Sequence, residues 1–158
     1  MSPLNFTHIL TQAVDELSES ESYKGLFHQH TDGNPLPSAK ALCVIIELAR
    51  AIIFPGYFGN STVNSRTVTY HIGVNVERLF DLLTEQILAG LCFGSDDEGS
   101  CCTELQRKEA ASIAARFISH LPELRRILAT DVEAAYNGDP AAHSFGEVIS
   151  CYPAIRAI

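Results

Sequence analysis

Apolar residues recur every three or four positions along most of this chain, which is the spacing that places them on one face of an α-helix. The pattern predicts helices over 5–17, 37–53, 68–92, 104–120, 124–136 and 144–150, another from Pro153 onward, and a short one around Tyr23, Leu26 and Phe27. Valine and threonine are common in 54–69, but no partner strand is visible elsewhere, so we expect a loop there. The predicted fold class is therefore all-α, with six to eight helices.

Turn and cap residues divide this pattern at defined places. Pro37 can occupy the first turn of its helix, and Pro55-Gly56 ends that helix. Pro122 is expected to end one helix and restart the next, and Asn137-Gly138 is a C-terminal stop signal. The residues expected to face inward include Leu42, Ile45, Ile46, Ala49, Ile52, Ile53, Val76, Leu79, Leu83, Ile113, Phe117 and Leu121.

Residues 1–158 are interpreted as a single helical domain, because no linker rich in proline, glycine or serine is long enough to divide them. Residues 1–35 form an N-terminal part with several turn signals, and residues 36–150 form the helical core. The hydrophobic content of 46% argues against disorder.

The charge balance restricts the possible partners. The formal net charge is −8, whereas nucleic acids and anionic membranes are bound by basic surfaces, so we expect neither as a partner. The N-terminus lacks the pattern of a secretory signal, and no apolar run approaches the length of a membrane span. Five cysteines, an odd number, fit a reducing compartment, and we expect a cytoplasmic protein.

Two short clusters could carry metal or thiol chemistry. His28-x-His30-x-Asp32 offers ligand types that suit zinc, iron or manganese, but no second cluster completes a coordination shell, so a solvated loop is expected and no metal. Cys101-Cys102 is a vicinal pair that could be redox-active. The acidic run 96–98 disfavours the reactive thiolate there, so an inert pair is the favoured interpretation.

Asp139 is the remaining candidate. Because Pro140 follows it and two alanines come next, the local pattern is that of a helix start. The carboxylate would cap free backbone N–H groups, and Pro140 would take the first helical position.

The last third of the chain, TDVEAAYNGDPAAHSFGEVISCYPAIRAI, resembles the end of the N-terminal helical domain of serine O-acetyltransferases. The matching pieces are 131–134, 139–141, 152–153 and 154–157. Upstream, FPGYFGNSTVNSRTVTYHIG and VERLFDLLTEQI are similar to the longer bacterial and plant-type members. The resemblance covers roughly residues 40–158, and its specificity comes from the order and spacing of the pieces together.

The resemblance implies an enzyme that transfers acetyl from acetyl-CoA to L-serine, giving O-acetyl-L-serine for cysteine biosynthesis. The family's catalytic domain is a left-handed parallel β-helix that follows this region, so the chain is expected to be a truncated fragment in which 151–158 begin the linking helix. The base histidine and its aspartate would lie downstream, which leaves this fragment inactive and without bound acetyl-CoA. Asp139 matches the family's serine-binding aspartate, whereas His143 is interpreted as a histidine on a helix surface.

The resemblance also implies partners. Family members form trimers, some of which pair into dimers of trimers through the helical domain, and a C-terminal tail docks into cysteine synthase. The alternative is a stand-alone all-α interaction or thiol module without catalysis. A third interpretation is an acyltransferase of the same architecture that acts on another amino alcohol.

Overall fold

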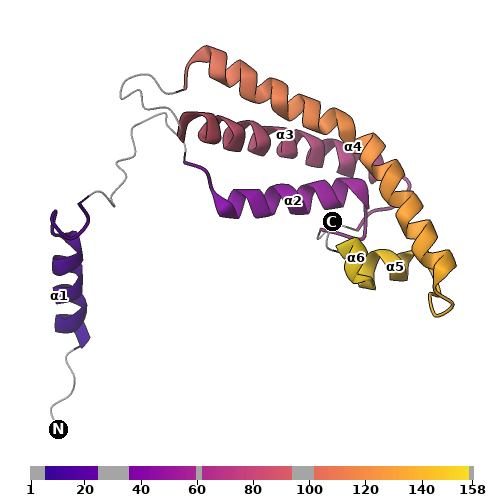
Figure 1. Cartoon of the computed structure of the whole chain (residues 1–158), viewed down its shortest axis with the longest axis horizontal. Helices are drawn as coiled ribbons and strands as arrows, with labels where there is room; N and C mark the ends of the chain where they lie inside the picture. Colours follow the sequence, from indigo (N-terminus) through magenta and orange to yellow (C-terminus); the bar gives the residue numbers. More distant parts are fainter. Residues whose placement is uncertain (1–5, 25–35, 60–61, 94–101, 157–158) are drawn as a thin grey trace, which may run out of the picture. The chain divides into compact units, whose positions relative to one another are not determined.

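The computed structural model describes residues 6–24, 36–59, 62–93 and 102–156. Within these ranges every regular element is a helix, and the six helices confirm the predicted all-α class (Figure 1). The chain divides into two compact units, Met1–Asp32 and Gly33–Ile158. Whether they count as one domain, as the sequence suggests, stays a prediction.

The first unit contains helix α1, Phe6–Ser18, close to its predicted bounds. Its apolar residues fall on one side of the helix, yet none of them is buried. Gln12 Nε2 donates a hydrogen bond to Glu16 Oε1 one turn later. The predicted second helix is not present at Tyr23, which lies in a turn, and Leu26 and Phe27 fall outside the described residues.

Helix α2, Ala39–Ile53, begins two residues later than predicted. Ser38, and not a helical Pro37, starts it: the Ser38 Oγ accepts a hydrogen bond from the Ala41 N–H at 3.2 Å. A serine cap satisfies one of the first free N–H groups of a helix, which proline cannot do. The helix ends at Ile53, just before Pro55-Gly56, as predicted.

Helices α3, Val68–Phe93, and α4, Glu104–Gly138, lie beside α2 and pack against it and each other (Figure 1). The predicted 68–92 helix is confirmed, and Leu79 at its middle is completely buried. The main core cluster around Leu79 joins the three helices and comprises Ile45, Leu48, Ile52, Ile53, Leu79, Leu121 and Leu128.

The prediction that Pro122 separates two helices is wrong, because α4 runs through it as one helix of 35 residues. Leu121 and Leu128 lie on opposite sides of the proline and are both buried in the same core. Arg125 Nη2 also donates to the carbonyl of Ile52, one of the last carbonyls of α2, which would otherwise lack a helical partner. Tertiary packing thus overrides the local cost of the proline.

The predicted inward face is also partly wrong. Leu42 and Ile46 are each 49% exposed, and Phe117 is 43% exposed. The buried side of α2 instead includes Leu48 and Ala51. The predicted helical period is correct. However, the side of α2 that packs against α3 and α4 is rotated about the helix axis, away from the side that carries Leu42 and Ile46.

Two short helices close the described chain: α5, Phe145–Cys151, and α6, Pro153–Arg156. They pack with the end of α4 in a separate cluster of Val132, Val148, Ile149 and Ile155. An edge-on contact between the rings of Tyr136 and Phe145, with centroids 4.8 Å apart, joins α4 to the start of α5. These contacts fix the turn that carries residues 139–144.

Candidate functional site

Asp139 does not start a helix, so the predicted capping role is wrong. It lies at the C-terminal cap of α4, where its backbone N–H donates to the Ala135 carbonyl at 3.2 Å. Its own carbonyl accepts from the Ala142 N–H at 3.0 Å, which closes a β-turn with Pro140 in the second position. Aspartate followed by proline is a common beginning for such a turn. The same two residues are also common at a helix start, so either structure can follow them.

Both carboxylate oxygens of Asp139 have a hydrogen-bond donor. The backbone N–H of Ala141 donates to Oδ1 at 2.9 Å, and the phenolic O–H of Tyr152 donates to Oδ2 at 2.5 Å. The hydrogen bond from Tyr152, and then that from Ala141, lowers the pKa of Asp139 below its ordinary value of 3.8. Asp139 is therefore an anion at neutral pH, held in a defined orientation.

The scaffold around this carboxylate comes from α5. Ser144 is the N-cap of α5, with its Oγ accepting from the Glu147 N–H at 3.1 Å. Glu147 Oε2 in turn accepts from the His143 N–H at 2.8 Å. The backbone N–H of Tyr152 then donates to the carbonyl of Val148, whose side chain is fully buried. The Asp139 turn and Tyr152 are thus held at the two ends of one small packed unit.

The carboxylate can accept further hydrogen bonds. Each carboxylate oxygen can take more than one donor, and Asp139 is only partly buried. A ligand with an ammonium or hydroxyl group is the chemical complement of such an anion. Within the described part of the chain, no three His, Cys, Asp or Glu side chains are grouped to hold a metal ion.

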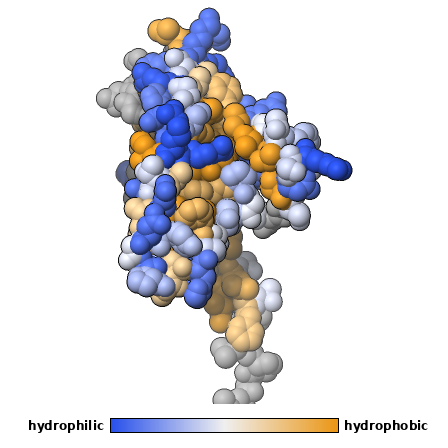
Figure 2. Space-filling view, turned by 90° about the vertical axis from the view of Figure 1, so that its right-hand side faces the viewer, coloured by the Kyte–Doolittle hydropathy of each residue, from blue (hydrophilic) through white to orange (hydrophobic). Residues whose placement is uncertain are grey.

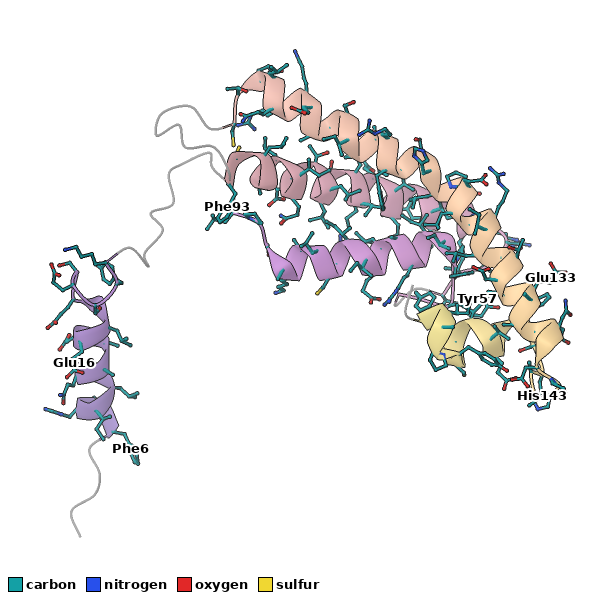
Figure 3. The ribbon with its side chains drawn as sticks, viewed as in Figure 1. Phe6, Glu16, Tyr57, Phe93, Glu133 and His143 are labelled. Atoms are coloured by element: carbon teal, nitrogen blue, oxygen red, sulfur yellow. The ribbon has the colours of Figure 1, made fainter. Side chains whose placement is uncertain are left out.

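His143 lies on the exposed turn before α5, outside the helix in which the sequence placed it (Figure 3). Its backbone binds Glu147, but no hydrogen bond among the described residues joins its ring to Asp139. The groups that do bond to the Asp139 carboxylate are the backbone N–H of Ala141, in the turn itself, and the hydroxyl of Tyr152. No pattern in the sequence pairs Tyr152 with Asp139, although the Tyr152-Pro153 match to the family was the available signal.

The other clusters have different outcomes. The His28-x-His30-x-Asp32 cluster lies outside the described residues, as does Cys101. Cys102 is buried, and its sulfur lies 2.9 Å from that of Cys92. The sequence suggested only the neighbouring pair Cys101-Cys102. The contact of Cys102 with Cys92 was not predicted, because the two residues are ten positions apart in the sequence.

An apolar groove lies over α2 and α4, with a volume of about 180 Å³. Its lining combines buried core residues with half-exposed ones at the rim, among them Ile46, Phe117 and Leu124. Figure 2 shows hydrophobic surface between polar areas on the side of the molecule that faces right in Figure 1.

Within the described residues, no helix combines the length and apolar character needed to span a membrane.

The fold and the site define an all-α protein with a carboxylate whose orientation is set by two hydrogen bonds. Its described residues bring no base and nucleophile together around that carboxylate.

Comparison with known proteins gives the relationship. The chain is 37% identical over 126 residues to the protein of Synechococcus elongatus named "Serine acetyltransferase, plasmid". The match covers 78% of this chain and 40% of that protein, and no family model matches the chain. The chain is thus a homologue of a serine acetyltransferase and spans about 40% of its length.

Proposed function

We propose that this chain is the N-terminal helical domain of a serine O-acetyltransferase, which transfers acetyl from acetyl-CoA to the hydroxyl of L-serine. The observation that carries the proposal is the homology over 126 residues to a serine acetyltransferase. The all-helical fold agrees with the resemblance of residues 40–158 to the helical domain of that family. The product would be O-acetyl-L-serine, for cysteine biosynthesis.

Asp139 is proposed to bind the substrate serine in the complete enzyme. Three properties support this role: the side chain is ionised at neutral pH, it is oriented by two hydrogen bonds, and it remains partly exposed. The ammonium group of serine can form a charge-assisted hydrogen bond with such a carboxylate, and the serine hydroxyl can donate to it as well. The binding of serine would then place its hydroxyl for reaction.

The chemical step needs groups that we expect elsewhere in the complete protein. A base must take the proton from the serine hydroxyl while the oxygen attacks the thioester carbonyl, and coenzyme A leaves as the thiol. The resemblance assigns the base and its orienting aspartate to the β-helix. We therefore expect this chain alone to be inactive.

Assembly is the second proposed role. The half-exposed rim of the apolar groove presents hydrophobic side chains that a partner subunit could bury. A symmetric homo-oligomer satisfies such surfaces with copies of the same chain. Trimers, or dimers of trimers, are the assemblies that the resemblance implies, and cysteine synthase stays a predicted partner of the complete protein.

The direct test is an activity assay on the complete protein encoded by the gene. We expect release of coenzyme A from acetyl-CoA that depends on L-serine and yields O-acetyl-L-serine by mass spectrometry. If the release of coenzyme A requires a different amino alcohol, that compound and not serine is the acetyl acceptor. If the natural protein has the 17.2 kDa mass of this chain and shows no release, the proposal is wrong and a stand-alone helical module takes its place.

A further inference from the structure

We propose that Tyr152 is a positioning residue for serine, because its hydroxyl fixes the orientation of the Asp139 carboxylate. This inference rests on the proposed function, in which Asp139 binds serine. It adds a residue that would act through Asp139 and not through contact with the substrate.

The geometry of the carboxylate is the first argument. Ala141 donates to one oxygen and Tyr152 to the other, so the plane of the carboxylate is defined at both ends. The last torsion of an aspartate side chain has a broad, roughly two-fold energy profile, and a single hydrogen bond leaves it loosely defined. With only the Ala141 hydrogen bond, the Asp139 carboxylate could still turn about the last torsion of its side chain. The second hydrogen bond, from Tyr152, prevents that rotation.

The anchoring of Tyr152 is the second argument. Its ring packs against the apolar cluster that contains Val148, Ile149 and Ile155. Its backbone N–H donates to the carbonyl of Val148 at 3.2 Å. A hydroxyl on a ring held by core contacts is a rigid donor, and rigid supporting contacts are what a binding group needs to keep its orientation.

The charge state agrees with this role. The hydrogen bond to Asp139 is the largest of the effects that raise the pKa of Tyr152 to about 12, followed by burial and by the charges of Asp139, Glu147 and Cys151. The phenol therefore keeps its proton and donates throughout the neutral range. The same bond keeps the carboxylate ionised, which preserves its attraction for an ammonium group.

The kinetic test uses Tyr152→Phe in the complete enzyme, with Tyr70→Phe on an exposed stretch of α3 as the matched control. Phenylalanine keeps the ring in the apolar cluster and removes only the hydroxyl. We expect the KM for serine to rise about tenfold, with the KM for acetyl-CoA unchanged and a smaller effect on kcat, as loss of a ground-state binding contact requires. Tyr70→Phe should leave all three constants unchanged.

A parallel Asp139→Asn variant separates this inference from the proposed function. If Asp139→Asn raises the KM for serine and Tyr152→Phe does not, the positioning role is wrong and the serine-binding role stands. If neither variant changes that KM, the serine-binding role of Asp139 is wrong as well.

A spectroscopic readout needs only the chain described here. Titration of the Asp139 carboxyl carbon by NMR should give a pKa below 3.8 in the wild-type chain and a higher pKa in Tyr152→Phe. A change in packing alone would leave this pKa unmoved. A wild-type pKa at or above 3.8, or identical values in the two proteins, would contradict the inference.

A second, independent observation concerns the sulfurs of Cys92 and Cys102, and from it we infer an oxidisable pair. Cys92 lies near the end of α3, and Cys102 directly precedes Thr103, the N-cap of α4. Their sulfurs are 2.9 Å apart and buried together with Leu88 and Ala110. Cys102 also has a φ of 71°, uncommon for a residue other than glycine, and its carbonyl accepts from Arg107 Nε.

Hydrogen peroxide is the oxidant class that fits so enclosed a pair. One thiol would be oxidised to a sulfenic acid with release of one water, and the second thiol would condense with it to give a disulfide and a second water. The bridge would join the end of α3 to the start of α4. By restricting the unfolded chain, it would raise the temperature of unfolding.

Intact mass spectrometry after peroxide treatment tests this pair. The wild-type chain and Cys101→Ser should each lose two hydrogens, reversibly with a dithiol reductant, whereas Cys92→Ser and Cys102→Ser should not. Peptide mapping should identify the bridge between residues 92 and 102. A bridge that persists in Cys92→Ser, or irreversible oxygen addition in place of a bridge, would contradict the inference.

Discussion

Gln86 Oε1 accepts a hydrogen bond from the backbone N–H of Ser38 at 2.7 Å, which ties the start of α2 to the C-terminal half of α3. Gln86 is the buried polar side chain of the described core, 8% exposed. Ser38 uses its own hydroxyl to cap α2, so one residue links the helix start to the neighbouring helix. The relationship joins two residues 48 positions apart.

Replacement of Gln86 by alanine should therefore destabilise the helical unit. The Ser38 N–H would lose its acceptor in a partly buried position, and such a loss costs about 1–3 kcal/mol. Chemical denaturation of Gln86→Ala should show this fall in the free energy of unfolding. The exposed neighbour Glu85, changed to alanine, should shift it by no more than about 0.5 kcal/mol. Equal shifts in the two variants would show that the Gln86 hydrogen bond contributes nothing.

The pairing of Asp139 and Tyr152 should make stability depend on pH at both extremes. The pKa of Asp139 is depressed, so its contribution is present above 3.8 and is lost as pH falls through the lower folded value. The pKa of Tyr152 is raised from 10.0 to about 12, so its contribution is present below 10.0 and is lost as pH rises through about 12.

Thermal unfolding across pH can measure both effects. Tyr152→Phe should weaken the pH dependence at both ends, whereas Tyr70→Phe should leave the acid end unchanged. An unaltered acid limb in Tyr152→Phe would show that the hydrogen bond does not couple these two titrations.

The rim of the apolar groove should contribute to subunit association. Phe117 is half-exposed at this rim, and aromatic residues at interfaces often carry much of the binding energy. In sedimentation experiments, Phe117→Ser should weaken self-association by about tenfold or more while helix content by circular dichroism stays the same. Leu105→Ser, an exposed apolar position near the start of α4, is the control. If Phe117→Ser weakens association no more than Leu105→Ser does, the groove is not the contact surface.

The sequence predicted the helices well because each carries its own apolar period and its own end signals. α1, α2 and α3 lie within a residue or two of their predicted bounds. Pro122 was misinterpreted because its local cost is visible in the sequence, whereas the packing of Leu121 and Leu128 and the bond from Arg125 are not. The rotation of α2 about its axis likewise depends on neighbours.

The candidate site was predictable only in part. Asp139 could be singled out from the resemblance, but its local pattern predicts a helix start, whereas the structure has a β-turn there, beside the ring contact that joins α4 to α5. The partnership with Tyr152 spans 13 positions and an intervening helix. No periodicity or spacing rule brings those two side chains together.

The proposed role of Asp139 in binding serine can be measured by steady-state kinetics of Asp139→Asn in the complete enzyme. Asparagine keeps the shape and removes the charge, so we expect the KM for serine to rise by about tenfold to hundredfold, with the KM for acetyl-CoA unchanged. Asp81→Asn, an exposed carboxylate on α3, should behave as the wild type. If Asp139→Asn keeps the wild-type KM for serine, Asp139 does not bind serine.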